Sequence, residues 1–217
     1  ETIGARDRTT LFSGSRRCCT FDDMTNRYFI QPIFTFLRDL AAHNDRDWFG
    51  QHRQAYVDLI RDPGTRLAAD LSQRLTEISP KFGPARLIRI QRDIRFSADK
   101  TPYKTHTGLY ARHADGDDVR APGLYLRIEP GKCHLDVGMW RPAGPHATAL
   151  RSAIVAEPDA WLEATSSKQF TERFALNGAS LMRPPRDVEP DHPLIDDLKR
   201  RDFMASAPLT HKVVTSS

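Results

Sequence analysis

The chain has few cysteines, no long apolar run and none of the motifs that identify common enzyme classes. Only three cysteines occur among its 217 residues. Cys18 and Cys19 are adjacent and Cys133 stands alone, so neither a disulfide framework nor a Cys-x-x-Cys metal pattern is present. Such usage is typical of the reducing cytoplasm, where we expect the protein to reside. Its apolar runs are far too short to span a bilayer, so no membrane partner is expected.

Nucleotide, hydrolase and zinc templates are missing as well. The sequence contains no GxGxxG, Walker or GxSxG pattern, and its eight histidines show no HExxH spacing. A Ser-x-x-Lys match at Ser97 and Lys100 needs a helical turn, which Pro102 disfavours at the preceding residue. We therefore expect no cofactor and no metal, and the sequence leaves open whether the protein is an enzyme.

The positive charge is compact. The net charge is +4, and six basic and two acidic residues between Arg86 and Lys104 account for all of it. A nucleic-acid-binding protein usually spreads its basic excess over a wide face. The compact excess argues against nucleic acid and favours a small anionic ligand as the partner. The sequence does not determine the oligomeric state.

The N-terminal segment lacks hydrophobic periodicity. We expect residues 1–28 to form a disordered extension and residues 29–217 to form a single domain. From Pro32 an apolar stripe predicts a helix, and Asn44 or Asp45 can cap a second one. Trp48 lies on the apolar face of that second helix and is expected in the core.

Two Pro-containing sites punctuate the helical region. Pro63 and Gly64 are expected to end the second helix. A third helix is expected over 67–78, ending before Pro80.

The hydrophobic period then changes from helical to alternating. Alternation over Ile88–Phe96 predicts a strand, with a helix as the rival, and makes Arg92 a polar exception on the apolar face. Further strands are expected over Thr105–Arg112, Leu124–Ile128 and Cys133–Met139. A turn signal at Pro130-Gly131 predicts that the last two strands form a hairpin.

The remaining chain returns to helical patterns after Pro142. A Pro-rich loop follows over 183–193, Ile195 to Phe203 suggests one short helix, and the end "HKVVTSS" shows no closing element. Helices, then strands, then helices predict an α+β fold with N-terminal helices, a central antiparallel sheet and C-terminal helices.

The stretch "RDIRFSADKTPYK" concentrates the chemistry of the chain. Arginine offers a fork for carboxylate or phosphate, lysine a point charge and tyrosine a donor, while the two aspartates could orient the cations or act as a base. The candidate ligand-binding residues are Arg92, Asp93, Arg95, Ser97, Asp99, Lys100, Tyr103 and Lys104. The alternative is an internal salt-bridge lock, because ion pairs that only hold a loop mimic a site.

A second, weaker cluster lies on the predicted hairpin. His134 and Asp136 share the polar face of one strand, with Tyr125 and Arg127 on the neighbouring one. A His-x-Asp pair can ligate a metal, but no third ligand accompanies it, and a solvated sheet face explains it as well.

Three stretches carry a resemblance to a known family. "HNDRDWFGQHRQAYVDLIRDP", "RDIRFSADKTPYKTH" and "GLYLRIEPGKCHLDVGMWRP" resemble the conserved proteins called domain of unknown function 2461. The resemblance runs from about Phe34 to Met204. The family motif R-D-x-R-F-S-x-D-K-T-P-Y-K is complete here from Arg92 to Lys104. His134 and Asp136 are not part of the family pattern.

The resemblance implies that the Arg92–Lys104 stretch is a built feature of this fold, and it transfers no activity. Members of the family continue past the end of this chain, which implies a further C-terminal segment. From the sequence we expect a protein that binds a small phosphate- or carboxylate-bearing ligand at this stretch. The alternative is a non-catalytic structural or partner-binding module with an internal lock.

Overall fold

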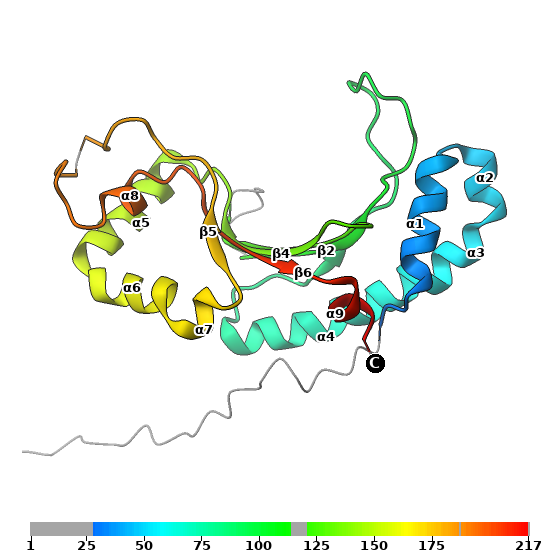
Figure 1. Ribbon diagram of the computed structural model, residues 1–217, viewed down its shortest axis with the longest axis horizontal. Coiled ribbons are helices and arrows are strands. Elements are labelled where there is room, and N and C mark those ends of the chain that lie inside the picture. Colours follow the sequence, from blue (N-terminus) through cyan, green and yellow to red (C-terminus); the bar gives the residue numbers. More distant parts are fainter. Residues whose placement is uncertain (1–27, 114–120, 187, 217) are drawn as a thin grey trace, which may run out of the picture.

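The computed structural model describes residues 28–113, 121–186 and 188–216. These residues form an α+β protein with N-terminal helices, a central antiparallel sheet and C-terminal helices, as the sequence predicts (Figure 1). The expected extension, residues 1–28, lies outside these ranges apart from Tyr28. Within the same ranges, no helix is long and apolar enough to cross a membrane.

One six-stranded sheet forms the centre of the molecule, in the order β1-β2-β3-β4-β6-β5, and every neighbouring pair is antiparallel. The predicted hairpin is confirmed, and it turns through Gly131 at a φ of 78°, which glycine adopts readily. The strands are β1 (Arg86–Leu87), β2 (Thr107–Arg112), β3 (Gly123–Ile128), β4 (Cys133–Met139), β5 (Ala175–Asn177) and β6 (Phe203–Leu209).

The strand predicted over Ile88–Phe96 is wrong. Only Arg86–Leu87 pairs with β2, and the Ile88 N–H donates to the carbonyl of Gly108 at 2.9 Å just beyond it. The chain then leaves the sheet as a projecting loop that returns at Lys104 (Figure 1). Pro102 has no N–H to donate, so the two arms of the loop cannot form a continuous ladder. They are joined by single bonds, such as Arg92 N–H to the Pro102 carbonyl at 2.9 Å.

The last strand and the closing helix were not expected from the sequence. β6 lies between β4 and β5, and Ala205 and Ala207 of β6 are buried. The strand is rich in alanine and contains Pro208, so its sequence does not show a clear alternation of large apolar and polar residues. After it, α9 (His211–Thr215) packs back on the N-terminal region, and the His211 ring stacks on Phe34 at 3.7 Å. The expectation that the chain ends without a closing element is therefore wrong.

The N-terminal region consists of α1 (Pro32–Ala42), a turn over 43–45, and then an irregular helical run. The elements of that run are α2 (Arg46–Gln51), α3 (Arg53–Tyr56), the π-helix η2 (Val57–Arg61) and α4 (Asp62–Ile78). Asp45 caps α2 as predicted, because its carboxylate accepts from the Trp48 N–H at 2.8 Å.

Pro63 does not end the run, so that prediction is wrong. It lies at the start of α4, directly after the π-helical turn of η2, and the helical backbone continues through it. Just before Pro63 the helix widens into a π-helical turn, in which the Asp62 N–H donates to the carbonyl of Val57, five residues earlier.

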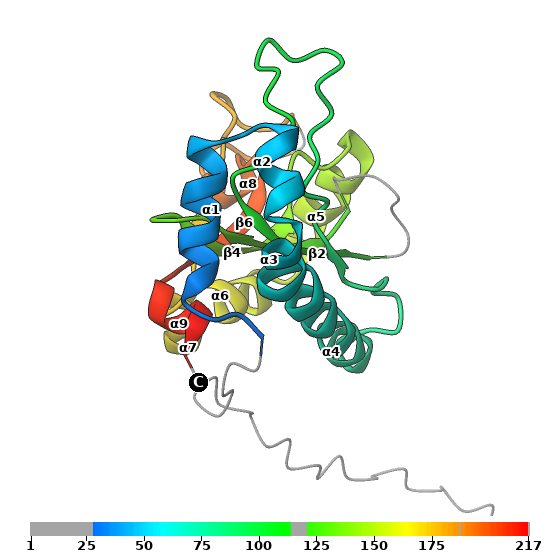
Figure 2. The same cartoon turned by 90° about the vertical axis from the view of Figure 1, so that its right-hand side faces the viewer.

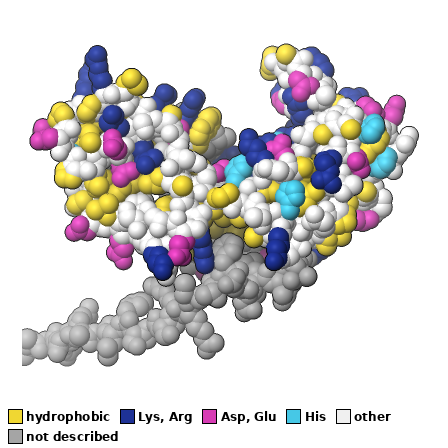
Figure 3. Space-filling view, in the orientation of Figure 1, with side chains coloured by type: hydrophobic (Ala, Val, Ile, Leu, Met, Phe, Trp, Pro, Cys, Tyr) yellow, Lys and Arg dark blue, Asp and Glu magenta, His cyan; other side chains and the backbone are white. Residues whose placement is uncertain are grey.

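Two cores lie at opposite ends of the sheet. α1, η2 and α4 bury Ile33, Leu37 and Ile60 against β2, with Trp48 packed at the edge of this core. At the other end, α5 (Gly144–Ala156), α6 (Pro158–Ser166), α7 (Lys168–Thr171) and α8 (Ile195–Leu198) surround a smaller core with Ile154, Leu198 and Phe203. The outline dips between these two raised ends, and Lys and Arg side chains appear on both sides of the dip (Figure 3).

Candidate anion-binding site

The Arg92–Lys104 loop projects from the sheet and is ordered by its own side chains. The Arg92 guanidinium donates to the Asp99 carboxylate and to the Thr101 hydroxyl, and reaches Ser97 Oγ at 3.4 Å. The Asp99 carboxylate also accepts from the Thr101 N–H at 2.9 Å. The hydrogen bond from the Thr101 N–H is the largest cause, and the hydrogen bond from Arg92 the next, of a pKa of Asp99 that is lowered to about 2. Arg92, which the sequence predicted to need a partner, is therefore paired within the loop.

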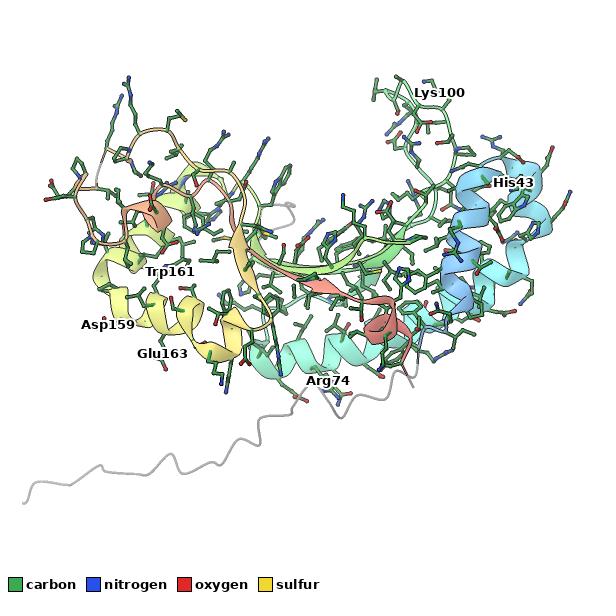
Figure 4. All side chains as sticks on the ribbon, viewed as in Figure 1. His43, Arg74, Lys100, Asp159, Trp161 and Glu163 are labelled. Carbon is green, nitrogen blue, oxygen red and sulfur yellow. The ribbon has the colours of Figure 1, made fainter. Side chains whose placement is uncertain are left out.

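The other charged residues of the loop are occupied too. Arg95 donates to both carboxylate oxygens of Asp93, at 2.9 and 2.6 Å, and these bonds lower the pKa of Asp93. The Lys100 ammonium, at the outer end of the loop, donates to the carbonyl of Ile94 at 3.1 Å (Figure 4). Lys104 donates to the backbone carbonyls of Arg89 and Gln91, at 2.6 and 3.0 Å.

These contacts match the internal lock that the sequence left as an alternative. The predicted residues come together as one network around Arg92 and one pair at Arg95, rather than as a single pocket. The side chains of Arg95 and Asp93 are 76% and 53% exposed, so their pair contributes little to stability. The loop is thus held in one shape while its outer residues face solvent.

Tyr103 connects the loop to the N-terminal helices. The Asn44 side chain, in the turn before α2, donates to the Tyr103 carbonyl at 2.9 Å and accepts from its N–H at 3.0 Å. The ring of Tyr103 stacks on that of Phe49 at 4.1 Å between centroids. α2 and α3 accordingly stand beside the arms of the loop (Figure 2).

A cleft of about 490 Å³ opens at this junction, and we call it the helix–loop cleft. Phe49, Tyr56 and Tyr103 supply aromatic rings to its surface, and Phe49 itself is buried. The cleft is lined by Arg46, Phe49, Gly50, Arg53, Tyr56, Val57, Arg61, Gln91 and Tyr103. Its volume falls within the range of small-molecule sites.

The three arginines of the cleft come from one face of the helical run. Positions 46, 50, 53, 57 and 61 recur at the spacing of a helical stripe, which aligns Arg46, Arg53 and Arg61 along one wall. Carboxylates flank these arginines in the sequence, at Asp45, Asp47, Asp58 and Asp62, but do not line the cleft. No carboxylate lies among the described lining residues, and only Arg61 has an ion-pair partner in the described ranges, Asp62 at 2.9 Å.

The two phenols of the cleft are potential donors. Burial raises the pKa of Tyr56, and the positive charge of Arg61 partly opposes that shift. Tyr56 therefore carries its proton at neutral pH. A ligand in the cleft would meet guanidinium groups, phenolic O–H groups and the amide of Gln91, all of which can donate to an anion.

A second polar hollow, of about 500 Å³, lies on the open face of the sheet. The register confirms that Tyr125 faces Asp136 and Arg127 faces His134. His134 Nε2 lies 3.2 Å from Asp136, whose carboxylate also accepts from the Ser206 hydroxyl. Asn177 donates to Ser206 at 2.5 Å, so the polar groups of this hollow largely satisfy one another.

The described side chains provide no group of three or more His, Cys, Asp or Glu residues that could hold a metal ion. His134 and Asp136 lie together without a third ligand of these types.

The arginines of the helix–loop cleft were missed in the sequence. They lie on the polar side of the second helix, whereas the prediction for this helix rested on its apolar stripe. The spacing of seven and eight residues between Arg46, Arg53 and Arg61 was the available signal. Of the predicted residues, only Tyr103 lines this cleft.

Comparison with protein families identifies the chain. The model of a conserved hypothetical protein family, DUF2461, matches residues 32–217. The chain belongs to this family. A search of curated proteins and a search of solved structures found no match. The DUF2461 match spans both the helical run and the loop that form the cleft.

Proposed function

We propose that this DUF2461 protein binds a small anionic ligand, bearing a phosphate or carboxylate, in the helix–loop cleft. One observation carries the proposal: three arginines and two tyrosines line a cleft to which the described residues contribute no carboxylate. Of the three arginines, only Arg61 has an ion-pair partner in the described part of the chain, so Arg46 and Arg53 are available to pair with a bound anion. We propose binding and no reaction, because the lining offers donors rather than a nucleophile beside a base.

The Arg92–Lys104 loop has a supporting role in this proposal. Its internal pairs fix the loop, and Asn44 fixes Tyr103 against Phe49 at the mouth of the cleft. The motif residues would therefore act by holding one wall of the site, with Tyr103 in contact with the ligand. The competing function is a structural or partner-binding module in which the same pairs lock the loop and no anion binds.

A thermal-shift titration with phosphate, against chloride at matched ionic strength, tests the proposal. Phosphate should stabilise the wild type by mass action, by about 2.7 kcal/mol at one hundred times the dissociation constant. Arg53→Ala should lose most of this effect, because Arg53 lies in the middle of the arginine stripe. Arg74→Ala should keep it, because Arg74 is an exposed arginine on α4, away from the cleft (Figure 4).

Two results would contradict the proposal. A wild type that ignores phosphate would favour the structural module. A loss of the phosphate effect in Lys100→Ala, with Arg53→Ala unaffected, would move the anion to the outer end of the loop.

A further inference from the structure

Gly50 stands out among the residues of the helix–loop cleft because the fold does not require it. Glycine inside a helix costs stability relative to alanine, and is usually kept for a positive φ or a close approach. Gly50 lies within α2 and is not among the glycines with positive φ. A Cβ added at this position would meet no atom within 4 Å. Neither backbone conformation nor crowding explains this glycine.

The missing side chain leaves space in the middle of the arginine wall. Gly50 lies on the helical stripe between Arg46 and Arg53, next in sequence to Phe49. Because Gly50 is itself a lining residue, a larger side chain here would take up space at the wall of the cleft. The same cleft is lined by the aromatic residues Phe49, Tyr56 and Tyr103.

An anion alone would not use this aromatic surface. Phosphate interacts with the arginines and phenolic hydroxyls, whereas a ring face offers it no donor. The cleft combines two chemistries, cations for a charged group and rings for a flat apolar one. Stacking on aromatic side chains stabilises planar groups in many binding sites.

We infer that the ligand of the helix–loop cleft is an aromatic anion, whose flat ring occupies the space left by Gly50 and whose phosphate or carboxylate binds the arginines on either side. This inference rests on the proposed function and adds the class of the ligand. Position 50 then determines specificity, while Arg46 and Arg53 supply the charge complement.

Isothermal titration calorimetry with two matched pairs of probes tests the inference: phenyl phosphate against inorganic phosphate, and benzoate against acetate. In at least one pair the aromatic member should bind the wild type about tenfold more tightly. The pair that shows this preference identifies the charged group as phosphate or carboxylate. Cyclohexyl phosphate, which is equally bulky but not flat, should bind more weakly than phenyl phosphate if phosphate is the charged group.

Gly50→Leu provides the matched variant. It should remove the preference for the aromatic probe over its plain partner, which is read as the ratio of the two dissociation constants measured in the same variant. Gly144→Leu is the control, since Gly144 also has open space around its Cα and lies on α5 at the other end of the molecule. If Gly50→Leu does not fold, Gly50→Ala, which favours the helix, should still reduce the preference.

The outcomes separate this inference from the proposed function. Binding of plain anions without any preference for the ring in either pair overturns the inference and leaves the anion site intact. A ring preference that survives in Gly50→Leu also overturns it. Absence of binding by all the probes overturns the proposed function as well.

Discussion

Thr107 places a hydroxyl group without a hydrogen-bond partner among the buried residues of the described chain. It is the first residue of β2, it is 1% exposed, and its hydroxyl has no hydrogen-bond partner in the described part of the chain. A buried hydroxyl that loses its bonds to water costs free energy unless a protein group replaces them.

We expect Thr107→Val to increase the free energy of unfolding by about 1 kcal/mol, because valine has the same shape and no unsatisfied group. Urea denaturation of the wild type and the variant measures this change. Thr107→Ser, which keeps the hydroxyl and loses the methyl group, should instead destabilise the protein. A loss of stability in Thr107→Val would mean that the hydroxyl has a partner.

At the scale of elements, the Arg92–Lys104 loop depends on the turn before α2. The side-chain amide of Asn44 donates to the carbonyl of Tyr103 and accepts from its N–H. It thus takes the place that a neighbouring strand would have in a sheet. The loop and the second helix are 59 residues apart in sequence at this contact. The two walls of the helix–loop cleft are held together here.

Asn44→Ala should therefore loosen the loop. It leaves the N–H and carbonyl of Tyr103 without their partner, at a cost of about 2 kcal/mol. Hydrogen exchange of the amides over 92–104 should become faster than in the wild type. Asn177→Ala is the control, because this asparagine bonds Ser206 on the sheet and not the loop. Unchanged protection of the loop amides in Asn44→Ala would show that other contacts hold it.

At the scale of the whole molecule, stability depends on pH through His106. Burial, with added repulsion from Arg127 and Lys104, lowers the pKa of His106 to about 4 from the usual 6.5. Between these values the unfolded chain takes up a proton that the folded protein does not. The stability that neutral His106 contributes is therefore present above pH 6.5 and is lost as the pH falls toward 4.

His106→Asn should make stability less dependent on pH in this window, because asparagine does not titrate. Urea unfolding at several pH values between 7 and 4 measures the two slopes. Asp99 does not confuse the comparison, since its pKa of about 2 limits its effect to lower pH. Equal slopes in the two proteins would contradict the pKa assigned to His106.

Much of the fold followed from local patterns in the sequence. The cap at Asp45, the turn at Gly131 and the alternation in β3 and β4 depend on neighbouring residues, which is why they could be predicted. The α+β class followed from the order of helical and alternating patterns in the same way. The sequence also predicted a partner for Arg92, but from a strand that does not form; the partner, Asp99, lies in the same loop.

Only the tertiary structure decided the position of β6, the path of the chain after Ile88, and the site. β6 has small residues and a proline, so it is a strand only because β4 and β5 lie on either side of it. The helix–loop cleft joins Arg53 to Tyr103, and no local pattern relates residues that far apart. Arg92 pairs with Asp99 and Arg95 with Asp93, whereas Arg46 and Arg53 of the helical run have no ion-pair partner among the described residues. The contact between Asn44 and Tyr103, which are 59 residues apart, brings the loop beside the arginines of the helical run.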